Sequence, residues 1–438
     1  MRLRLWIRLR RVLMTVLYIG ICLLVLDLIG IPRLIEQLMA DPTRLSLFTH
    51  NTVSFCGGNF KGYVNKFAHL KMVILDPKKS DGRVGGEDVK SVLEQPEFVE
   101  YFEFSPGYFT LECSAIPTYR FRDEHHLNMW MDVLKPQDPT LTTDILQAKG
   151  GDSVRKKFTI AVTRYEYANL YHQMADIYNA YIMLRVFNLD PDKTDILFVD
   201  GHPKSNLDEI WDTLFGDVIR AGHLKEPLLF ENLIWNIQGY TSSIHQHDRE
   251  KIPEVPEFGH FVLHRHGMSE NRKLDCRNIS VLFIWRRNYV AHPRNPSGVV
   301  ARKVLNENEV ISFVQNNLHV DGKPTGTVKG IHLEAMSFGE QLQHIRNTDI
   351  LIGIHGAGLS HALFLPQHAG LIEIFSSRKL AVNRHFQALA RWRGVRYEKY
   401  ENRYTNNDAG NDDVTLEPFE IAELVNEMRD KICHDESL

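Results

Sequence analysis

A helix-like segment at residues 166–181, EYANLYHQMADIYNAY, carries side chains that are able to do acid–base chemistry. His172 and Asp176 are four residues apart, a spacing at which two side chains of one helix can touch. Such a pair is suited to act as a general base near neutral pH. The alternative is a solvated helix face without a catalytic role. At about 100° per residue, the polar face of this helix consists of Glu166, Asn169, His172, Asp176 and Asn179.

A glycine-rich turn, GIHGAGLS at residues 353–360, connects an apolar run to a helix-like segment. Glycine lets a backbone approach a ligand closely, and a helix N-terminus offers free N–H groups and a partial positive charge to phosphate. The turn is neither a dinucleotide fingerprint nor a Walker loop, because His361 replaces the third glycine and the Lys-Ser/Thr pair is missing. We therefore predict an anion site here rather than a crossover without a ligand. Its residues are His355, Gly356, Ala357 and Gly358.

A basic segment, WRRNYVAHPR at residues 285–294, follows an apolar run typical of a buried strand. In a parallel sheet, ligands bind beyond the carboxyl ends of the strands, so we expect Arg286 to share one edge with the glycine-rich turn. Two cationic elements at one edge suit a diphosphate, and the alternative is scattered surface charge. Glu373, near the end of a later apolar run, is a candidate acceptor for ribose hydroxyls, although a solvated carboxylate at a strand end is the commoner case.

Alternating segments after residue 155 predict the fold class. Continuous apolar runs favour strands buried on both faces, and helix-like segments separate them, which is typical of a parallel, doubly wound α/β sheet. Residues 55–150 lack this alternation and predict an irregular α+β lead-in. The strand-like segments are 158–164, 195–201, 281–287, 328–335, 350–356, 371–375 and 395–400, and the helix-like ones are 165–187, 307–318, 358–364, 383–392, 417–432 and one that opens at Ser337.

The composition is that of a globular protein. The 438 residues are 43% hydrophobic and 24% charged, enough for two or three domains of roughly 100–200 residues each. Five of the 51 Lys and Arg residues lie in the first eleven positions, which leaves 46 against 55 acidic residues in the remainder. Since nucleic-acid binders gain affinity by neutralising phosphates, this acidic body argues against nucleic acid as a partner.

The N-terminus predicts a membrane anchor. A twenty-residue apolar run at 12–31 carries one charge, Asp27, and is long enough to cross about 30 Å of hydrocarbon. Because basic residues stay cytoplasmic, residues 1–11 form a cytoplasmic tail, and residues 32–54 form a luminal stem. The alternative, a cleaved signal peptide, fits less well because the run is longer than an h-region and no small-x-small site follows it.

A luminal location changes the expectation for the cysteines. Cys22 lies in the predicted anchor, and four others would sit in an oxidising compartment, where one or two disulfides are favoured over a free buried thiol. Three connectivities are open for these four. The sequon at Asn278 agrees with a luminal body. The four cysteines are Cys56, Cys113, Cys276 and Cys433.

Several blocks together resemble glycosyltransferase family 61. The HGAGL turn is typical of the whole family, whereas EYANL, FVDGH and YxAHPR are similar to members that add β-1,2-xylose to N-glycans. The resemblance spans about residues 155–430. The blocks are EYANLYHQMADIYNAY (166–181), LFVDGHPKSNLDEIWDTLF (197–215), LFIWRRNYVAHPR (282–294) with VLNENEV (304–310), and ILIGIHGAGLSHALF (350–364) with LIEIF (371–375).

The resemblance implies a GT-B-like fold, in which two facing Rossmann-like, doubly wound domains follow an N-terminal transmembrane helix. The acceptor and the base are expected on an N-terminal domain at 55–265, and the nucleotide sugar on a C-terminal domain at 266–438. The implied reaction moves xylose from UDP-xylose to the 2-hydroxyl of the core β-mannose of N-glycans, with inversion. It implies a single-pass type II protein of the Golgi membrane with a luminal body that acts on glycoproteins.

Further expectations concern individual residues. Trp285 stands where the plant members usually have the first of two arginines, so the phosphate-binding role passes to Arg286 alone. We favour Asp176 as the base with His172 in support, because a carboxylate stays ionised in a mildly acidic Golgi whereas a histidine of pKa about 6.5 becomes half protonated. The choice between the two residues stays open.

No metal cofactor is expected to be required, because Arg286 and a helix dipole are able to neutralise a diphosphate. The DxD form at Asp190 and Asp192 is interpreted as a turn. Two alternatives to xylosyl transfer also stay open. One is an O-linked N-acetylglucosaminyltransferase of the same family that acts on protein, and the other is an inactive, lectin-like type II ectodomain.

Overall fold

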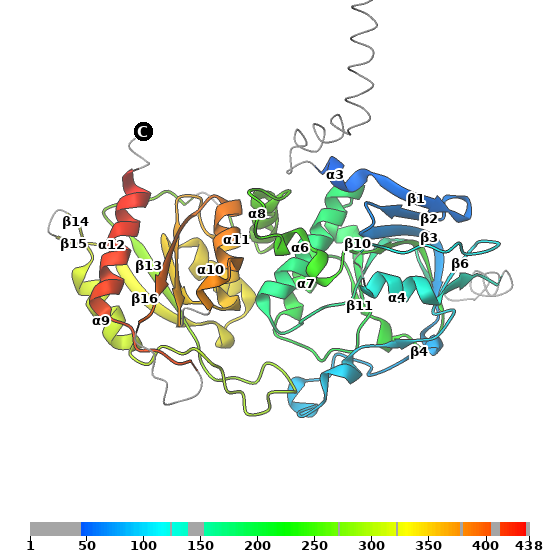
Figure 1. Ribbon diagram of the computed structural model, residues 1–438, viewed down its shortest axis with the longest axis horizontal. Helices are drawn as coiled ribbons and strands as arrows, with labels where there is room; N and C mark the ends of the chain where they lie inside the picture. Colours follow the sequence, from blue (N-terminus) through cyan, green and yellow to red (C-terminus); the bar gives the residue numbers. More distant parts are fainter. Residues whose placement is uncertain are drawn as a thin grey trace, which may run out of the picture. The chain divides into compact units, whose positions relative to one another are not determined.

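Two β-sheets organise this chain, one formed by the first half of the sequence and the other by the second (Figure 1). The computed structural model describes residues 45–122, 125–138, 153–269, 272–320, 323–376, 380–403 and 412–434, which lie within one unit, Leu45–Leu438. The predicted tail, the anchor at 12–31 and the stem up to residue 44 lie outside these ranges. Among the described helices, none is long and apolar enough to cross a membrane. Since both sheets belong to one unit, the domain boundary between 265 and 266 stays a prediction.

The first sheet is mixed and has the order β1-β2-β3-β12-β9-β10-β11. From β12 to β11 the strands are parallel, whereas β1, β2 and β3 are antiparallel and β3 pairs antiparallel with β12. The strands are β1 (Asn51–Phe55), β2 (Phe60–Tyr63), β3 (Phe67–Leu75), β12 (Leu228–Trp235), β9 (Phe158–Val162), β10 (Thr194–Phe198) and β11 (Val218–Arg220), with the short β6 (Phe109–Leu111), β7 (Leu134–Pro136) and β8 (Val154–Arg155) at its side.

The prediction of a doubly wound sheet is therefore wrong for part of the first half. Residues that were expected to form an irregular lead-in contribute β2 and β3, and the end of the predicted stem contributes β1. β3 is a buried central strand that runs alongside all of β12. His69 and Lys71 interrupt the apolar run of β3, which hides it from a pattern search. His69 is nevertheless buried. Its burial is tolerated because its Nε2 atom lies 3.0 Å from the side-chain oxygen of Asn232 on β12.

The second sheet is entirely parallel, as predicted, with the order β16-β13-β17-β18-β19. Counted along the chain this order is 2-1-3-4-5, so the winding reverses between β13 and β17. Ligands of such sheets bind beyond the carboxyl ends of the strands at the reversal. The strands are β13 (Ser280–Trp285), β16 (Thr327–His332), β17 (Ile350–Ile354), β18 (Gly370–Phe375) and β19 (Arg396–Glu401).

Helices cover the sheets and fill the space between them (Figure 1). One hydrophobic core runs from the first sheet to the second through the helices between them, so the two halves share their packing. On the far sides, α4 (His125–Val133) covers the first sheet, and α9 (Glu307–Asn317) and α12 (Pro418–His434) cover the second. The helices between the sheets are α6 (Leu170–Phe187), α7 (Asp208–Leu214), α8 (Val255–Arg265), α10 (Phe338–Arg346), α11 (His385–Arg393) and the 3-10 segment η11 (Ala357–Phe364).

Local sequence signals explain where several helices begin. Asn169 caps α6 by accepting a hydrogen bond from the backbone N–H of Tyr171, so the helix begins five residues later than the hydrophobic pattern suggested. The helix predicted to open at Ser337 is confirmed as α10, where Ser337 and Glu340 form a capping box. The segment after the glycine-rich turn is a 3-10 helix rather than an α-helix.

Two disulfides join the four cysteines predicted to be luminal. Cys56 pairs with Cys113, and Cys276 pairs with Cys433. The first bond lies at the edge of the first sheet, and the second ties the segment before β13 to the end of α12. This pairing resolves the three connectivities that the sequence left open.

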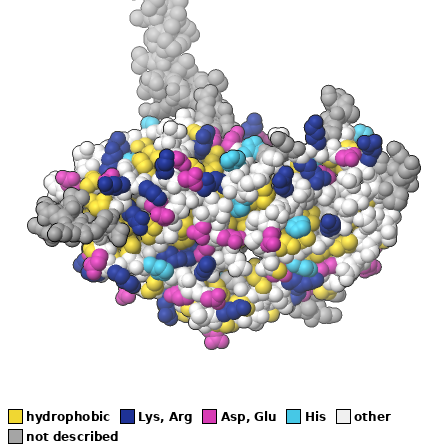
Figure 2. Space-filling view, turned by 180° about the vertical axis from the view of Figure 1, so that it is seen from behind, with side chains coloured by type: hydrophobic (Ala, Val, Ile, Leu, Met, Phe, Trp, Pro, Cys, Tyr) yellow, Lys and Arg dark blue, Asp and Glu magenta, His cyan; other side chains and the backbone are white. Residues whose placement is uncertain are grey.

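The surface gives no sign of a polyanion-binding face on the side shown in Figure 2. Acidic and basic side chains are interspersed there, and neither sign forms an extended patch. The exclusion of nucleic acid, drawn from the overall charge, stays a prediction.

Candidate functional site

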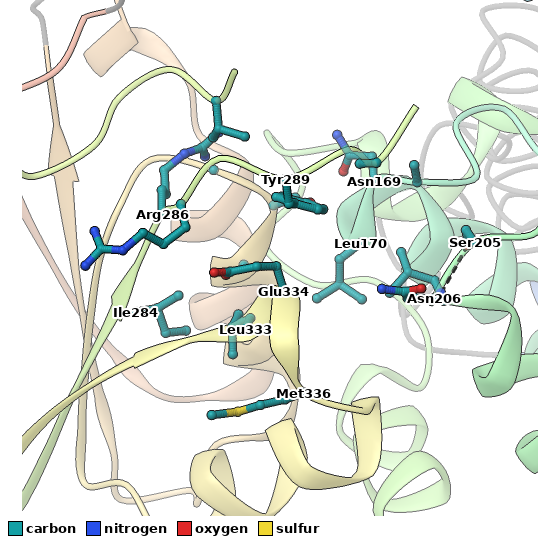
Figure 3. Close-up of a pocket in the computed structure, with 18 of the residues that line it drawn as sticks. Asn169, Leu170, Ser205, Asn206, Ile284, Arg286, Tyr289, Leu333, Glu334 and Met336 are labelled. Carbon is teal, nitrogen blue, oxygen red and sulfur yellow. Dashed lines mark hydrogen bonds between the residues drawn. The ribbon is translucent and has the colours of Figure 1, made fainter. Parts of the chain in front are cut away.

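A pocket of about 540 Å³, which we call the central pocket, opens at the carboxyl ends of β13 and β17. Both halves of the chain line it, as Figure 3 shows. This is the edge of the second sheet where the winding reverses, the expected place for a ligand. The residues labelled in Figure 3 are Asn169, Leu170, Ser205 and Asn206 from the first half, and Ile284, Arg286, Tyr289, Leu333, Glu334 and Met336 from the second.

Arg286 leaves β13 directly into the lining of this pocket. Among the described residues it has no ion-pair partner, and its Nε atom is buried without a hydrogen bond. Burial, together with the neighbouring charge of Arg302, lowers the pKa of Arg286 to about 10. A buried cation without a counter-charge is unstable on its own and is suited to receive an anion.

Arg287, the next residue, differs from Arg286 in having a partner for its charge. Arg287 forms two hydrogen bonds of 2.8 Å with the two carboxylate oxygens of Glu307, so its charge is already neutralised. Arg302 donates a 2.5 Å hydrogen bond to the backbone oxygen of His355 and thereby fixes the start of the glycine-rich turn. Of Arg286 and Arg287, Arg286 is the one whose charge no carboxylate of the described residues neutralises, and its role toward phosphate stays a prediction.

The glycine-rich turn lies against Arg286. A Cβ atom on Gly356 would overlap Nη1 of Arg286, so only glycine lets this guanidinium approach the backbone. A Cβ on Gly358 would lie 3.2 Å from the Leu333 side chain. Gly356, Ala357 and Gly358 all line the central pocket, which brings the predicted cation and the predicted turn together.

His355, the first residue of the predicted anion site, does not line the central pocket. Its Nδ1 atom lies 2.5 Å from Oε1 of Glu373, and the hydroxyl of Tyr397 donates to Oε2 of the same carboxylate at 2.7 Å. Glu373 is fully buried and positions His355. Its predicted contact with a ribose stays a prediction, and a ribose hydroxyl would have to share an oxygen that already has a donor.

The predicted His–Asp pair of α6 is not joined by a hydrogen bond in the described structure. Asp176 is 1% exposed, and its Oδ2 atom accepts a 3.4 Å hydrogen bond from the backbone N–H of Tyr165. His172 is half-buried among the rings of Tyr165, Tyr240 and His245. The interpretation of this face as solvated is wrong, because Asp176 and its neighbours toward the helix end are buried.

The electrostatics of α6 reverse the argument used to choose between the two residues. Burial raises the pKa of Asp176 to about 8, so this carboxyl is protonated rather than ionised in mildly acidic surroundings. Burial lowers the pKa of His172, which favours its neutral imidazole. Of the two, His172 is the one that retains a free lone pair for a proton.

One contact between the two halves of the chain was not predicted from the sequence. Glu166 forms hydrogen bonds with His292 and, at 2.5 Å, with Arg294. Although burial alone would raise it, the hydrogen bond from His292 and the charges of His292 and Arg294 lower the pKa of Glu166 to about 2. The signal was present, since the EYANL and YxAHPR blocks carry these residues, but their contact spans 126 positions.

A buried ion network lies beneath the first-half wall of the pocket. Arg164 is fully buried and binds Asp200 at 2.7 Å and Asp208 at 2.9 Å. Although burial alone would raise it, the charge of Arg164 lowers the pKa of Asp200. Since Arg164 and Asp208 flank the lining segments 168–170 and 204–207, this network fixes the first-half wall of the pocket.

The DxD form lies away from the central pocket and caps a turn, as interpreted from the sequence. Asp190 accepts a hydrogen bond from the backbone N–H of Asp192 at the start of a 3-10 turn, and Asp192 pairs with Arg265 at 2.7 Å. Within the part of the chain that the structure describes, no group of three or more His, Cys, Asp and Glu residues is placed to hold a metal ion.

The sequence of this chain is similar to those of known proteins. The profile of the family described as glycosyltransferase 61 matches residues 153–372. The β-1,2-xylosyltransferase RCN11 of Oryza sativa subsp. japonica is 27% identical over 354 residues, which cover 74% of this chain and 66% of that protein. The β-1,2-xylosyltransferase of Arabidopsis thaliana is 31% identical over 277 residues, which cover 55% of this chain and 50% of that protein.

A second group of relatives is named for another activity. The EGF domain-specific O-linked N-acetylglucosamine transferase of Drosophila melanogaster is 28% identical over 352 residues, which cover 72% of this chain and 60% of that protein. The chain thus spans about half to two thirds of the length of these relatives. The matched family region contains all lining residues of the central pocket except Asp88, Val89 and Lys90.

Proposed function

Since this chain belongs to the glycosyltransferase 61 family, we propose that it transfers xylose from UDP-xylose to the 2-hydroxyl of the core β-mannose of N-glycans, with inversion. The rice and Arabidopsis relatives, which are named β-1,2-xylosyltransferases, support the donor and the linkage. The two sheets on either side of the central pocket, the second entirely parallel and the first parallel from β12 to β11, support a GT-B-like arrangement, in which the second half holds the donor and the first half the acceptor.

The observation that carries the proposal is the unpaired guanidinium of Arg286 in the central pocket. It lies against Gly356, directly before the 3-10 helix η11, whose first residues Ala357 and Gly358 line the same pocket. A diphosphate placed there would supply the counter-charge that the described chain does not, and it would be the leaving group of the transfer. Since Arg286, Arg302 and the turn are able to neutralise it, we propose that no metal is required.

The reaction then needs one base. The acceptor oxygen attacks C1 of the xylose, the C1–O bond to UDP breaks, and the hydroxyl proton passes to the enzyme. We assign that proton to His172, because burial keeps its imidazole neutral and it lies among aromatic rings on the first half. Asp176, which carries its own proton below a pKa of about 8, serves to hold the start of α6 through Tyr165.

A second candidate is transfer of N-acetylglucosamine to protein. The Drosophila relative supports it, because its identity and its coverage of this chain are close to those of the rice xylosyltransferase. The difference between the two donors lies in the sugar and not in the diphosphate, so Arg286 and the glycine-rich turn serve both.

One matrix of assays decides among these functions. UDP-xylose and UDP-N-acetylglucosamine are each incubated with an N-glycan acceptor and with a folded EGF domain, and product is identified by mass spectrometry. Xylosylated glycan alone supports the proposal, and a modified EGF domain supports the second candidate. UDP binding without product in any combination indicates the inactive ectodomain.

We also propose a Golgi location with a cytoplasmic N-terminus and a luminal body anchored by residues 12–31. The two disulfides support an oxidising compartment. Protease added to intact microsomes should leave the body protected, and the mature protein should still begin at Met1. A mature N-terminus beyond residue 25 would contradict the uncleaved anchor.

A further inference from the structure

An open groove of about 620 Å³ lies beside the central pocket and shares none of its lining residues. Residues 245–249 of the first half form one wall, and residues 382–385 at the start of α11 form the other. We propose that this groove, called here the histidine groove, binds the neutral oligosaccharide that accepts the sugar. This inference rests on the proposed function and specifies where its acceptor lies.

The lining of the histidine groove suits hydroxyl groups. Gln246 and Asn383 supply amides, with that of Asn383 also 3.4 Å from Nε2 of His355, and Arg249 supplies a guanidinium group. Asp248 and Arg384 pair with each other at 3.1 Å and keep their remaining donors and acceptors for a ligand. Each sugar hydroxyl both donates and accepts, and this set offers partners of both kinds. Its aliphatic lining is limited to Val382, whereas a groove for a folded protein would offer larger apolar anchors.

Both walls of the groove are held rigidly. The Arg391 side chain donates hydrogen bonds of 2.6 Å to the backbone oxygens of His247 and Arg249, and Trp392 donates one of 2.9 Å to Arg249. These bonds attach the first-half wall to α11. A groove with fixed walls loses little conformational entropy when a ligand binds, which favours a weakly interacting ligand such as a neutral glycan.

A row of imidazoles leads from the groove in two directions. Ring centroids lie 5.6 Å apart between His172 and His245, 6.3 Å between His245 and His247, 4.4 Å between His247 and His385, and 6.0 Å between His385 and His355. The row therefore runs from the proposed base to the turn of the central pocket. An acceptor in the groove would lie against His245, His247 and His385, in the middle of this row.

The imidazoles of the row are suited to hydroxyl groups rather than to anions. Burial and the neighbouring imidazoles lower the pKa of His245 to about 3 and that of His385 to about 4, so both are neutral. A neutral imidazole offers one donor and one acceptor. The Nδ1 atom of His385 is buried and has no hydrogen-bond partner in the described chain.

An aromatic surface lies at the first-half end of the row. Tyr240 is 59% exposed, and its ring lies 4.9 Å from His245 and 5.8 Å from His172. The Tyr165 ring supports it from 4.5 Å. An exposed ring fixed by its neighbours offers a flat apolar face and a polar tip, the combination that packs against the C–H face of a sugar and bonds to its hydroxyls.

The groove is tested first by binding without turnover. Saturation-transfer NMR is recorded with the full-length chain in detergent and an N-glycan core oligosaccharide, in the absence of any nucleotide sugar. Wild type is expected to show saturation of the mannose protons, and both Gln246→Ala and Tyr240→Ala are expected to weaken it. Equal signals from both variants and wild type would overturn the proposal, and so would binding to an EGF domain in place of the glycan.

Kinetics then separate the groove from the donor site. Gln246→Ala and Asn383→Ala should raise the acceptor KM about tenfold, as expected for the loss of one or two hydrogen bonds, while the donor KM stays unchanged. The matched control is Gln343→Ala, an exposed amide on α10 outside both sites. A raised donor KM with an unchanged acceptor KM would overturn the assignment. If the proposed transfer itself fails, the NMR measurement still decides whether the groove binds glycan.

Discussion

Replacing Arg286 with Met tests whether this buried cation serves a ligand or the fold. Burial and Arg302 hold the pKa of Arg286 at about 10 instead of 12.5. Since one pKa unit corresponds to about 1.4 kcal/mol, the charged form destabilises the folded protein by on the order of 3 kcal/mol. Because the folded pKa is lowered, this destabilisation is present in full below pH 10 and shrinks as the pH rises toward 12.5. In the described chain the side chain has no ion pair that its removal would break.

We therefore expect Arg286→Met to affect activity without lowering stability. Arg286→Met should leave the melting temperature of the ligand-free protein unchanged or raise it by a few degrees, as replacement of a buried charge by an apolar side chain often does. At the same time kcat/KM for UDP-xylose should fall by about 10²–10³, the usual loss when one charge-stabilising contact to a transition state is removed. Differential scanning fluorimetry and initial rates at varied donor concentration measure the two quantities.

The neighbouring arginine provides the control. Arg287→Met breaks two 2.8 Å hydrogen bonds and leaves the carboxylate of Glu307 unpaired, so it should lower the melting temperature. Its effect on the donor KM should be smaller than that of Arg286→Met. The reasoning is refuted if Arg286→Met lowers the melting temperature and leaves kcat/KM unchanged, because the guanidinium would then be a structural group.

Four further outcomes are expected. His172→Gln should lower kcat by about 10²–10⁴, whereas Asp176→Asn, which mimics the protonated form favoured below a pKa of about 8, should keep more than a tenth of it; the opposite order, measured at saturating substrates, would restore Asp176 as the base. Since Asp176 is favoured in its neutral form, wild type should lose stability as the pH rises through 8 and Asp176→Asn should not, which pH-dependent urea melts would detect. Activity should survive EDTA, and a complete loss restored by Mn²⁺ would show that a metal is needed. Joint replacement of Cys276 and Cys433 by Ser should lower the free energy of unfolding by about 2–4 kcal/mol in urea titrations.

The second sheet could be predicted from sequence because its strands carry local signals. Segments such as ILIGI at 350–354 and GLIEIF at 370–375 are short apolar runs between helices, and burial on both faces makes each run continuous. The antiparallel part of the first sheet could not be predicted in this way. His69 and Lys71 break the apolar pattern of β3, and pairing with β12, more than 150 residues away, is what makes this segment a strand.

The candidate site also has parts that could be predicted from the sequence and parts that could not. Arg286 and the glycine-rich turn each follow a strand of one parallel sheet, so their meeting follows from the topology alone. The chemistry of His172 and Asp176 does not, because their pKa values depend on how deeply α6 is buried between the two sheets. The Glu166–His292 contact joins two segments of different sheets. The sequence shows that both residues are present, but it does not show that they lie close together.

One turn separates the two places where ligands are proposed to bind. On one side, Gly356 lines the central pocket against Arg286. On the other, Nε2 of His355 lies 3.4 Å from the amide nitrogen of Asn383, which lines the histidine groove. Inverting transfer requires the entering oxygen and the leaving phosphate on opposite faces of the reacting carbon. A diphosphate held beside Gly356 and an acceptor held beside Asn383 would therefore react only if the acceptor hydroxyl extended from the histidine groove past His355 to the sugar in the central pocket, and Glu373 fixes the His355 ring that it would have to pass.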